Sequence, residues 1–143
     1  MSQTQIFSRY HPDNELPPSV NDWIWVFGSN LAGRHGAGSA KVAKVTFGAE
    51  YGVGRGPTGR SYAIPTKDER LAVLDLPAIE QSINDFILYA QTYPEKLFYV
   101  TRVGCGLAGY KNEQIGPLFA SAPPNCSLPI QWKSYTTKTG APL

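Results

Sequence analysis

The chain has 143 residues, of which 42% are hydrophobic and 17% charged, and its formal net charge is +2. This length fits one domain with a single core, and the composition is that of an ordinary globular protein. The small net charge and the absence of a basic run disfavour nucleic-acid binding, and no apolar stretch approaches the ~18 residues needed to span a bilayer.

Cysteine and histidine are too sparse to indicate a metal site. Cys105 and Cys126 form no C-x-x-C pair, and the only histidines, His11 and His35, have no carboxylate pair beside them. One disulfide between the two cysteines is the alternative, but two free thiols in a reducing cytoplasm fit the sequence better. Residues 1–5 lack the features of a signal peptide. We therefore expect a cytoplasmic protein with no membrane partner, no metal and no cofactor.

The N-terminal segment, residues 1–22, is polar and interrupted by three prolines. Residues 6–10 are a candidate edge strand. Residues 23–27 form a continuous apolar run, which is typical of a strand covered on both faces.

A glycine-rich loop follows this strand. Residues 28–38 hold four glycines in eleven positions, and a helical pattern begins directly after them and ends at Gly48. Glycine lets a ligand approach bare backbone amides, and a helix N-terminus adds free N–H groups and a positive dipole end. The pattern favours a site for an anion, most often a phosphate. A tight turn that needs glycine for its geometry alone is the alternative.

Residues 48–60 are the part of the chain richest in glycine. Residues 54–59 match the letters of the dinucleotide fingerprint G-x-G-x-x-G, but a strand, residues 61–65, follows them where the fingerprint needs a helix. We therefore interpret the segment as a surface loop. Lys67 lies just beyond that strand. Its position at the sheet edge fits a solvated turn as well as it fits a ligand site.

The second half of the chain repeats the alternation of helix and strand. Pro77 begins the clearest helix and Pro94 ends it. The further elements are a strand at 97–101, a loop at 102–110, a short helix that begins near Asn112, a strand at 127–130 and a polar, loose tail at 133–143.

The order β-α-β-α-β-α-β predicts an α/β fold, with helices on both faces of a mainly parallel or mixed sheet. One domain covers residues 1–143, with its core at about 23–131. Ligands of such sheets bind beyond the carboxyl ends of the strands. If the strands before them are neighbours, the loops 28–38 and 104–110 face each other across one crevice. Two sets of backbone amides in such a crevice suit a diphosphate better than a single phosphate. The Walker pattern is absent, which argues against an NTPase.

Two segments resemble macrodomains, the ADP-ribose-binding family. Gly28-Ser29-Asn30 with its glycine run is similar to their first ligand loop, and residues 101–110 are similar to the second. Residues 61–65 stand where that family has the strand between the two loops. The chain also resembles uncharacterised bacterial and phage proteins that carry F-G-S-N-x-x-G-x-H-G-x-G and V-T-x-x-G-C-G-x-A-G segments. The resemblance covers about residues 23–131.

The resemblance implies a three-layer α/β/α fold and a site for ADP-ribose or a related NAD metabolite. Asn30 would contact the distal ribose, loop amides would bind the phosphates, and Tyr110 would line the site near the terminal ribose. The implied ligand-binding residues are Ser29, Asn30, Gly33, Gly36, Ala37 and Gly38 in the first loop, and Gly104, Cys105, Gly106, Leu107, Ala108, Gly109 and Tyr110 in the second.

Two positions depart from the family. Ala108 stands where many macrodomains have an aromatic residue that packs on the distal ribose. The early aspartate that holds the adenine has no secure match, because Asp22 lies just before the first strand. A different nucleotide or a sugar phosphate is therefore also a candidate ligand.

If the chain is an enzyme, we expect it to hydrolyse a phosphate or an ADP-ribosyl group at the distal ribose. Asn30 would orient the substrate or water. His35, which we expect to be exposed because glycines flank it, would transfer a proton. The alternatives are that Asn30 bonds its own turn and that His35 is a surface histidine. For Cys105 a small buried thiol is favoured over a nucleophile.

Two other functions stay open. One is a protein that sequesters or senses a nucleotide signal without turnover. The other is a domain that binds RNA or a protein through Arg34, Arg55 and Arg60, although RNA binding relies on several cations and the net charge is small.

Overall fold

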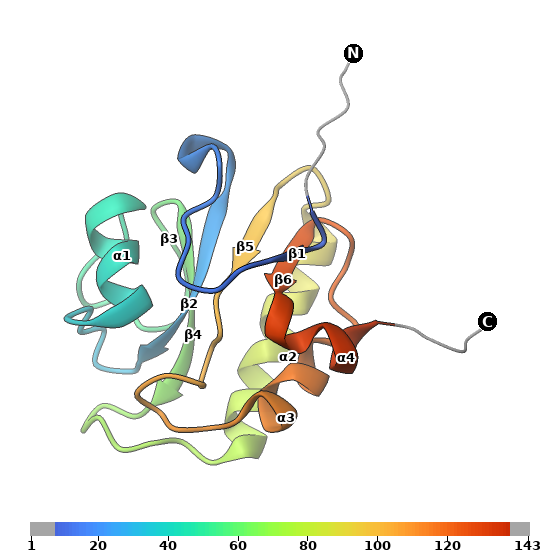
Figure 1. The fold of residues 1–143 in the computed structure, drawn as a ribbon. Coiled ribbons are helices and arrows are strands. Elements are labelled where there is room, and N and C mark those ends of the chain that lie inside the picture. Colours follow the sequence, from blue (N-terminus) through green and yellow to red (C-terminus); the bar gives the residue numbers. More distant parts are fainter. Residues whose placement is uncertain (1–7, 138–143) are drawn as a thin grey trace.

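The fold is built on one sheet whose strands come from the whole length of the chain. A computed structural model describes residues 8–137 (Figure 1). The strands are β1 (Tyr10–His11), β2 (Ile24–Asn30), β3 (Gly56–Thr58), β4 (Ser61–Lys67), β5 (Phe98–Val100) and β6 (Cys126–Pro129). Their order in the sheet is β1-β6-β5-β2-β4-β3.

The sheet is parallel except at one edge. Strand β2 pairs in parallel with both β4 and β5, β6 pairs in parallel with β5 and β1, and β3 is antiparallel to β4. The expected α/β class with a mainly parallel sheet is therefore confirmed. Because β2 lies between β4 and β5, the segments that follow all three strands leave the sheet at neighbouring points.

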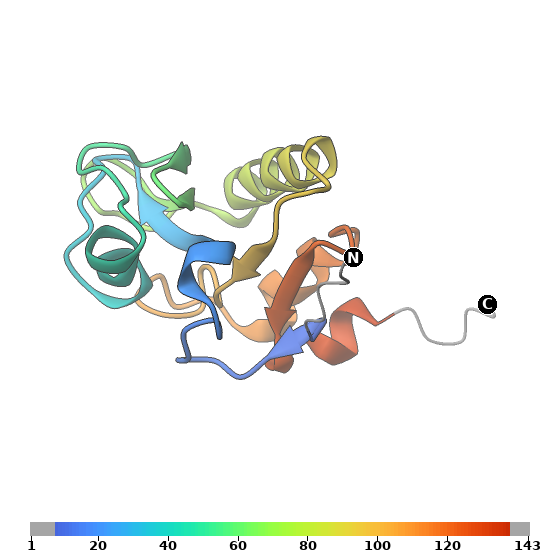
Figure 2. The same ribbon diagram turned by 90° about the horizontal axis from the view of Figure 1, so that it is seen from above.

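Helices cover both faces of the sheet. They are α1 (Gly38–Thr46), α2 (Leu76–Thr92), α3 (Asn112–Ile115) and α4 (Lys133–Thr136), with three 3-10 turns, η1 (Val20–Asp22), η2 (Gly116–Phe119) and η3 (Ile130–Trp132). Helix α1 packs on one face, and α2, α3 and α4 lie on the other (Figures 1 and 2).

Strand β2 explains the two layers of core. Trp25 and Phe27 pack against α1, whereas Val26 belongs to the larger cluster under α2, and all three are at most 5% exposed. Successive side chains of a strand point to opposite faces. The uninterrupted apolar run at the start of β2 thus reflects burial on both sides, as its sequence predicts.

Helix α2 follows its sequence signals closely. The Asp75 side chain caps it by accepting a hydrogen bond from the Ala78 N–H at 3.1 Å, and Pro77 lies in the first turn. Its fully buried stripe faces the sheet and consists of Ile79, Ile83, Phe86 and Ala90. No helix within residues 8–137 combines the length and the apolar character needed to cross a membrane.

Two expectations at the chain ends need correction. The tail was expected to be loose from residue 133, but residues 133–136 form α4, and the Trp132 and Thr136 side chains are buried. The periodicity missed this helix because it is one turn long and is held by the packing of Trp132 under η2. The edge strand was expected at residues 6–10. Among the described residues it covers only Tyr10–His11, and residues 6–7 lie outside the described part of the chain.

The glycine-rich segment 48–60 is also more ordered than a surface loop. Residues 56–58 form β3, which makes a hairpin with β4. A strand therefore follows the G-x-G-x-x-G letters, as expected, and the segment does not have the strand-loop-helix context of a dinucleotide site.

We expect the α2 stripe to dominate stability. Replacing Ile83, which is fully buried, by alanine removes packed methyl groups and should lower the free energy of unfolding by about 2–5 kcal/mol. The matched change Leu88→Ala, at a side chain 63% exposed on the same helix, should cost less than about 0.5 kcal/mol. Urea unfolding followed by circular dichroism measures both, and equal losses would contradict this account of the core.

Candidate functional site

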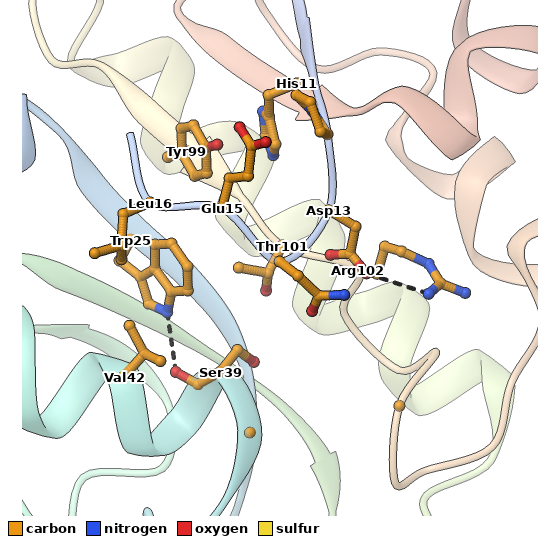
Figure 3. A pocket seen from close by; sticks show the side chains of 14 residues that line it. His11, Asp13, Glu15, Leu16, Trp25, Ser39, Val42, Tyr99, Thr101 and Arg102 are labelled. Carbon is orange, nitrogen blue, oxygen red and sulfur yellow. Dashed lines mark hydrogen bonds and ion pairs between the residues drawn. The ribbon is translucent and has the colours of Figure 1, made fainter. Parts of the chain in front are cut away.

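Two adjoining cavities lie at the carboxyl edge of the sheet. The first, which we call the loop crevice, has a volume of about 560 Å³ and lies between the loop after β2, the end of β4 and the loop after β5. The second, the N-terminal pocket, measures about 440 Å³ and is formed by residues 11–16 against α1 and β5 (Figure 3). The two cavities share four lining residues, Gly38, Ser39, Arg102 and Gly106.

The two glycine-rich loops meet at the loop crevice. A β-carbon built on Gly28 would lie 3.4 Å from the backbone nitrogen of Gly104, so the first loop passes close to the second. Both loops leave neighbouring parallel strands, β2 and β5, at the same edge. The expectation that the loops share one crevice is confirmed.

Several backbone N–H groups of both loops have no acceptor among the described residues. Helix α1 begins at Gly38 without a side-chain cap, and its first backbone bond runs from Lys41 N–H to the Ala37 carbonyl. The N–H groups of Gly38, Ser39 and Ala40, which precede that bond, therefore have no partner within residues 8–137. In the second loop no described residue accepts a hydrogen bond from the N–H of Gly104, Gly106, Leu107 or Ala108. Unpaired amides at a helix N-terminus and in a tight loop are the donors with which proteins commonly bind anions.

The side chain of Asn30 braces the first loop. Its Oδ1 accepts the Arg34 N–H at 3.0 Å, and its Nδ2 donates to the Arg34 carbonyl at 2.9 Å. Asn30 therefore bonds the turn that follows it, which was one of the two expectations, and it also lines the loop crevice. One N–H of its amide is left for a ligand.

The segment 50–54 supports the same loop from behind. The Ser29 hydroxyl donates to the Gly54 carbonyl, and the Gly52 N–H donates to the Gly33 carbonyl at 2.8 Å. Gly33 has a φ of +73°, and a β-carbon there would collide with the Gly52 backbone. Gly33 is thus required for the contact between loops and does not line either cavity.

His35 is buried, so the expectation that it would be exposed is wrong. It is 2% exposed, with Nε2 3.0 Å from the Val53 carbonyl and its ring edge-on to Phe27 at 5.4 Å. Flanking glycines made an exposed position plausible, but the segment 50–54 packs over the ring. His35 lines neither cavity, and its Nδ1 has no hydrogen-bond partner among the described residues.

The second loop divides into residues that face the crevice and residues that close the turn. Gly104, Gly106, Leu107 and Ala108 line the crevice. Cys105, Gly109 and Tyr110, which were also expected to bind the ligand, do not line the crevice. Instead, Tyr110 donates its hydroxyl to the Leu74 carbonyl at 2.6 Å and packs against the core under α2.

Sequence reasoning missed the N-terminal pocket. His11, Tyr99 and Trp25 stack in a row on its floor, with ring centroids 3.7 Å and 5.7 Å apart. The Glu15 carboxylate lies beside the rings of Tyr99 and His11, and the Asp13 carboxylate lies in the same pocket next to Arg102 (Figure 3). The pocket exists because β1 pairs with β6 and lays residues 11–16 across the sheet edge, and no local motif in the sequence signals that pairing.

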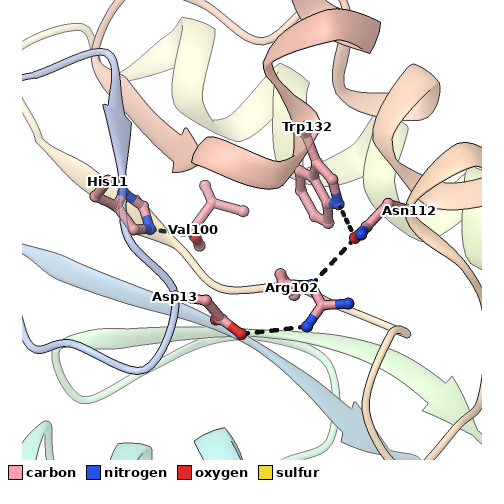
Figure 4. A network of polar contacts seen from close by, with 6 residues as sticks. All are labelled: His11, Asp13, Val100, Arg102, Asn112 and Trp132. Carbon is pink, nitrogen blue, oxygen red and sulfur yellow. Dashed lines mark hydrogen bonds and ion pairs between the residues drawn. The ribbon is translucent and has the colours of Figure 1, made fainter.

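Arg102 connects the two cavities to the C-terminal part of the fold (Figure 4). Its guanidinium lies 3.3 Å from the Asp13 carboxylate, and its Nε donates to Asn112 Oδ1 at 3.1 Å. The same oxygen accepts the indole N–H of Trp132 at 3.0 Å. Arg102 is therefore fixed at the border of the cavities.

Burial keeps the floor of the N-terminal pocket uncharged. It lowers the pKa of His11 to about 4, against the opposing effects of the Val100 carbonyl and the Asp13 carboxylate. Burial, with smaller contributions from Glu15 and Asp13, raises the pKa of Tyr99 to about 12. Near neutral pH both rings are neutral, and the charges in the pocket are those of Asp13, Glu15 and Arg102.

The chain matches none of the protein-family models, curated proteins or solved structures with which we compared it. The assignment of the site therefore depends on its own residues. No group of three or more histidine, cysteine, aspartate or glutamate residues within residues 8–137 is placed to hold a metal ion. The site offers backbone amides and cations for an anion, next to flat rings and carboxylate acceptors.

The two thiols should differ in reactivity. Both cysteines are free, and burial raises the pKa of each, to about 12 for the fully buried Cys126, whereas Cys105 is only half-buried. At pH 8, iodoacetamide should modify Cys105 at least about tenfold faster than Cys126, because the thiolate is the reactive form. Mass spectrometry of peptides measures the rates. Both thiols should react alike in denaturant, and equal rates in the native protein would contradict the structure.

His11 should make the fold sensitive to mild acid. Its pKa is about 4 when folded and near 6.5 when unfolded, so the unfolded chain binds the extra proton first as the pH falls. Stability should therefore fall by up to about 3 kcal/mol between pH 6.5 and pH 4. Chemical unfolding across this range tests the loss, and His11→Gln should remove it. An NMR titration midpoint of the His11 ring near 6.5 would contradict the prediction.

Proposed function

We propose that this chain is a macrodomain-like protein that binds ADP-ribose, or a related NAD-derived nucleoside diphosphate, across the two cavities. The observation that carries the proposal is that unpaired amides of α1 and of the second loop border one crevice. Two such sets of donors match the two phosphates of a diphosphate. Each cavity also falls within the usual size range of small-molecule sites.

The pyrophosphate fits best at the border of the cavities. Gly38, Ser39 and Gly106 line both cavities and offer backbone N–H groups there. The guanidinium of Arg102 adds a positive charge at the same place. A pyrophosphate bound at this border directs the nucleoside into one cavity and the terminal sugar into the other.

The N-terminal pocket suits the nucleoside. The stacked rings of Tyr99 and Trp25 give it an aromatic floor, and Asp13 and Glu15 supply acceptors for the N–H groups of a base. Asp13 is therefore the candidate for the aspartate that holds the base, a role for which the sequence offered only Asp22. Asp22 lies in η1 before β2, at the end of the strand away from both cavities.

The site supports binding more directly than hydrolysis. The described residues that line the loop crevice include no histidine, aspartate or glutamate, and His35 is buried behind the first loop. Asn30 and the loop amides hold and orient a ligand by hydrogen bonds. Release of a phosphate or of an ADP-ribosyl group remains the alternative, which analysis of the recovered ligand tests. No structural observation favours the RNA-binding function.

A side chain at Gly106 should block the site without disturbing the fold. A β-carbon there meets no atom within 4 Å, and its φ lies outside the region that favours glycine. Gly106→Val should place its methyl groups in the space shared by the cavities and weaken ADP-ribose binding at least about tenfold. Isothermal titration calorimetry with ADP-ribose, NAD and AMP measures the effect, and chromatography of the recovered ligand shows whether it is intact.

The matched control is Ala120→Val, at an exposed position that lines none of the cavities. It should leave both stability and ADP-ribose affinity unchanged. Failure of the wild-type protein to bind any of the three nucleotides, or an unchanged affinity in Gly106→Val, would refute the proposed function.

A further inference from the structure

An irregular segment of the chain forms one wall of the N-terminal pocket. We call this segment, residues 12–18, the strap; it runs from β1 to η1 (dark blue in Figure 1). Residues 12–16 of the strap line the pocket, together with residues of the sheet and of α1. The strap is therefore the wall of this pocket that neither the sheet nor α1 supplies.

Few contacts hold the strap to the rest of the fold. No backbone N–H or carbonyl group of residues 12–18 is hydrogen-bonded to a described residue. Three of its seven residues are prolines, which have no N–H to donate. The chain is fixed at both ends of the segment, because Nε2 of the buried His11 lies 2.9 Å from the Val100 carbonyl and Pro17 is buried. A segment with an unpaired backbone between two fixed ends has low local stability.

One side chain of the strap makes a polar contact with the body of the protein. Asp13 Oδ2 lies 3.3 Å from Arg102 Nη1, and the two side chains are 20% and 30% exposed. No other side chain of residues 12–18 forms a hydrogen bond or an ion pair with a described residue. Partial burial reduces the screening that makes fully exposed ion pairs weak. The Asp13–Arg102 ion pair is thus the polar link that holds the strap against the pocket.

Arg102 does not depend on Asp13 alone for its position. Its Nε donates to Asn112 Oδ1 at 3.1 Å, on the side of the guanidinium away from Asp13 (Figure 4). Arg102 also lines both cavities, at the border where the proposed function places the diphosphate. A phosphate there competes with the Asp13 carboxylate, because a guanidinium binds both kinds of anion through charge-assisted hydrogen bonds.

Building on the function proposed above, we propose that the Asp13–Arg102 ion pair is a latch on the strap, which the diphosphate of the ligand releases. The phosphate takes the Nη1 donor of Arg102, while Asn112 keeps the guanidinium in place. Asp13 then loses its partner, and its carboxylate becomes available to the N–H groups of the base. The freed strap moves away from the pocket. The phosphates therefore bind first and open the pocket for the nucleoside.

NMR relaxation of the protein without ligand tests the latch. Asp13→Ala removes the ion pair, so the backbone order parameters of Asn14 and Leu16 should fall from about 0.85 to below about 0.6. Glu15→Ala is the matched control, because it removes from the same strap a carboxylate that forms no ion pair. It should leave both order parameters as they are in the wild type. Equal order parameters in the wild type and in Asp13→Ala would overturn the inference.

Inorganic pyrophosphate tests the release. In the wild type, saturating pyrophosphate should lower the same order parameters to their values in Asp13→Ala. It should also tighten the binding of adenosine, measured by NMR titration, about fivefold or more. Asp13→Ala should abolish this gain, whereas Glu15→Ala should keep it, whatever its own affinity for adenosine. An adenosine affinity that pyrophosphate does not change in the wild type would contradict the latch.

The outcomes separate this inference from the proposed function. If ADP-ribose and pyrophosphate bind and the order parameters of the strap stay the same, the latch is wrong and the proposed function stands. If ADP-ribose fails to bind while pyrophosphate releases the strap, the latch stands and the proposed function is wrong. If neither ligand binds, both are wrong.

Discussion

The candidate site depends on the position of β2 between two parallel neighbours. Parallel pairing with β4 and β5 brings the carboxyl ends of three strands to one edge of the sheet. The loops that follow these strands therefore begin side by side. The loops come close at Gly28, where a β-carbon would lie 3.4 Å from the Gly104 backbone nitrogen. Amides from distant parts of the chain thereby reach one crevice, and burial of β2 on both faces holds the arrangement.

A second glycine-rich segment holds the first loop in shape. The Asn30 side chain closes the turn, the segment 50–54 accepts bonds from Ser29 and His35, and Gly33 lies against Gly52. Such contacts fix the loop without a ligand, so the proposed binding would cost little conformational entropy. Several residues that a sequence pattern assigns to ligand binding therefore act indirectly, because their contacts hold the loop in shape.

The sequence predicted the features that depend on local periodicity and on glycine. The apolar run of β2 and the stripe of α2 were readable because each pattern is complete within one element. The interior position of His35 was not, because it depends on the packing of residues 50–54, which carry no regular pattern. The N-terminal pocket was missed for a similar reason. It depends on the pairing of β1 with β6, more than a hundred residues apart, and the short helix α4 depends on Trp132 in the same way.

The chain of contacts from Trp132 through Asn112 to Arg102 and Asp13 has a consequence for the C-terminal part of the protein. The C-terminal turns lie outside both cavities, yet they help to hold Arg102 at the border of the two cavities. A chain shortened before Trp132 would remove one of the two hydrogen bonds that the Asn112 amide oxygen accepts, and the bond from Arg102 would be left. We therefore expect a change at Trp132 to alter the position of Arg102 at the border of the cavities, although Trp132 lines neither of them.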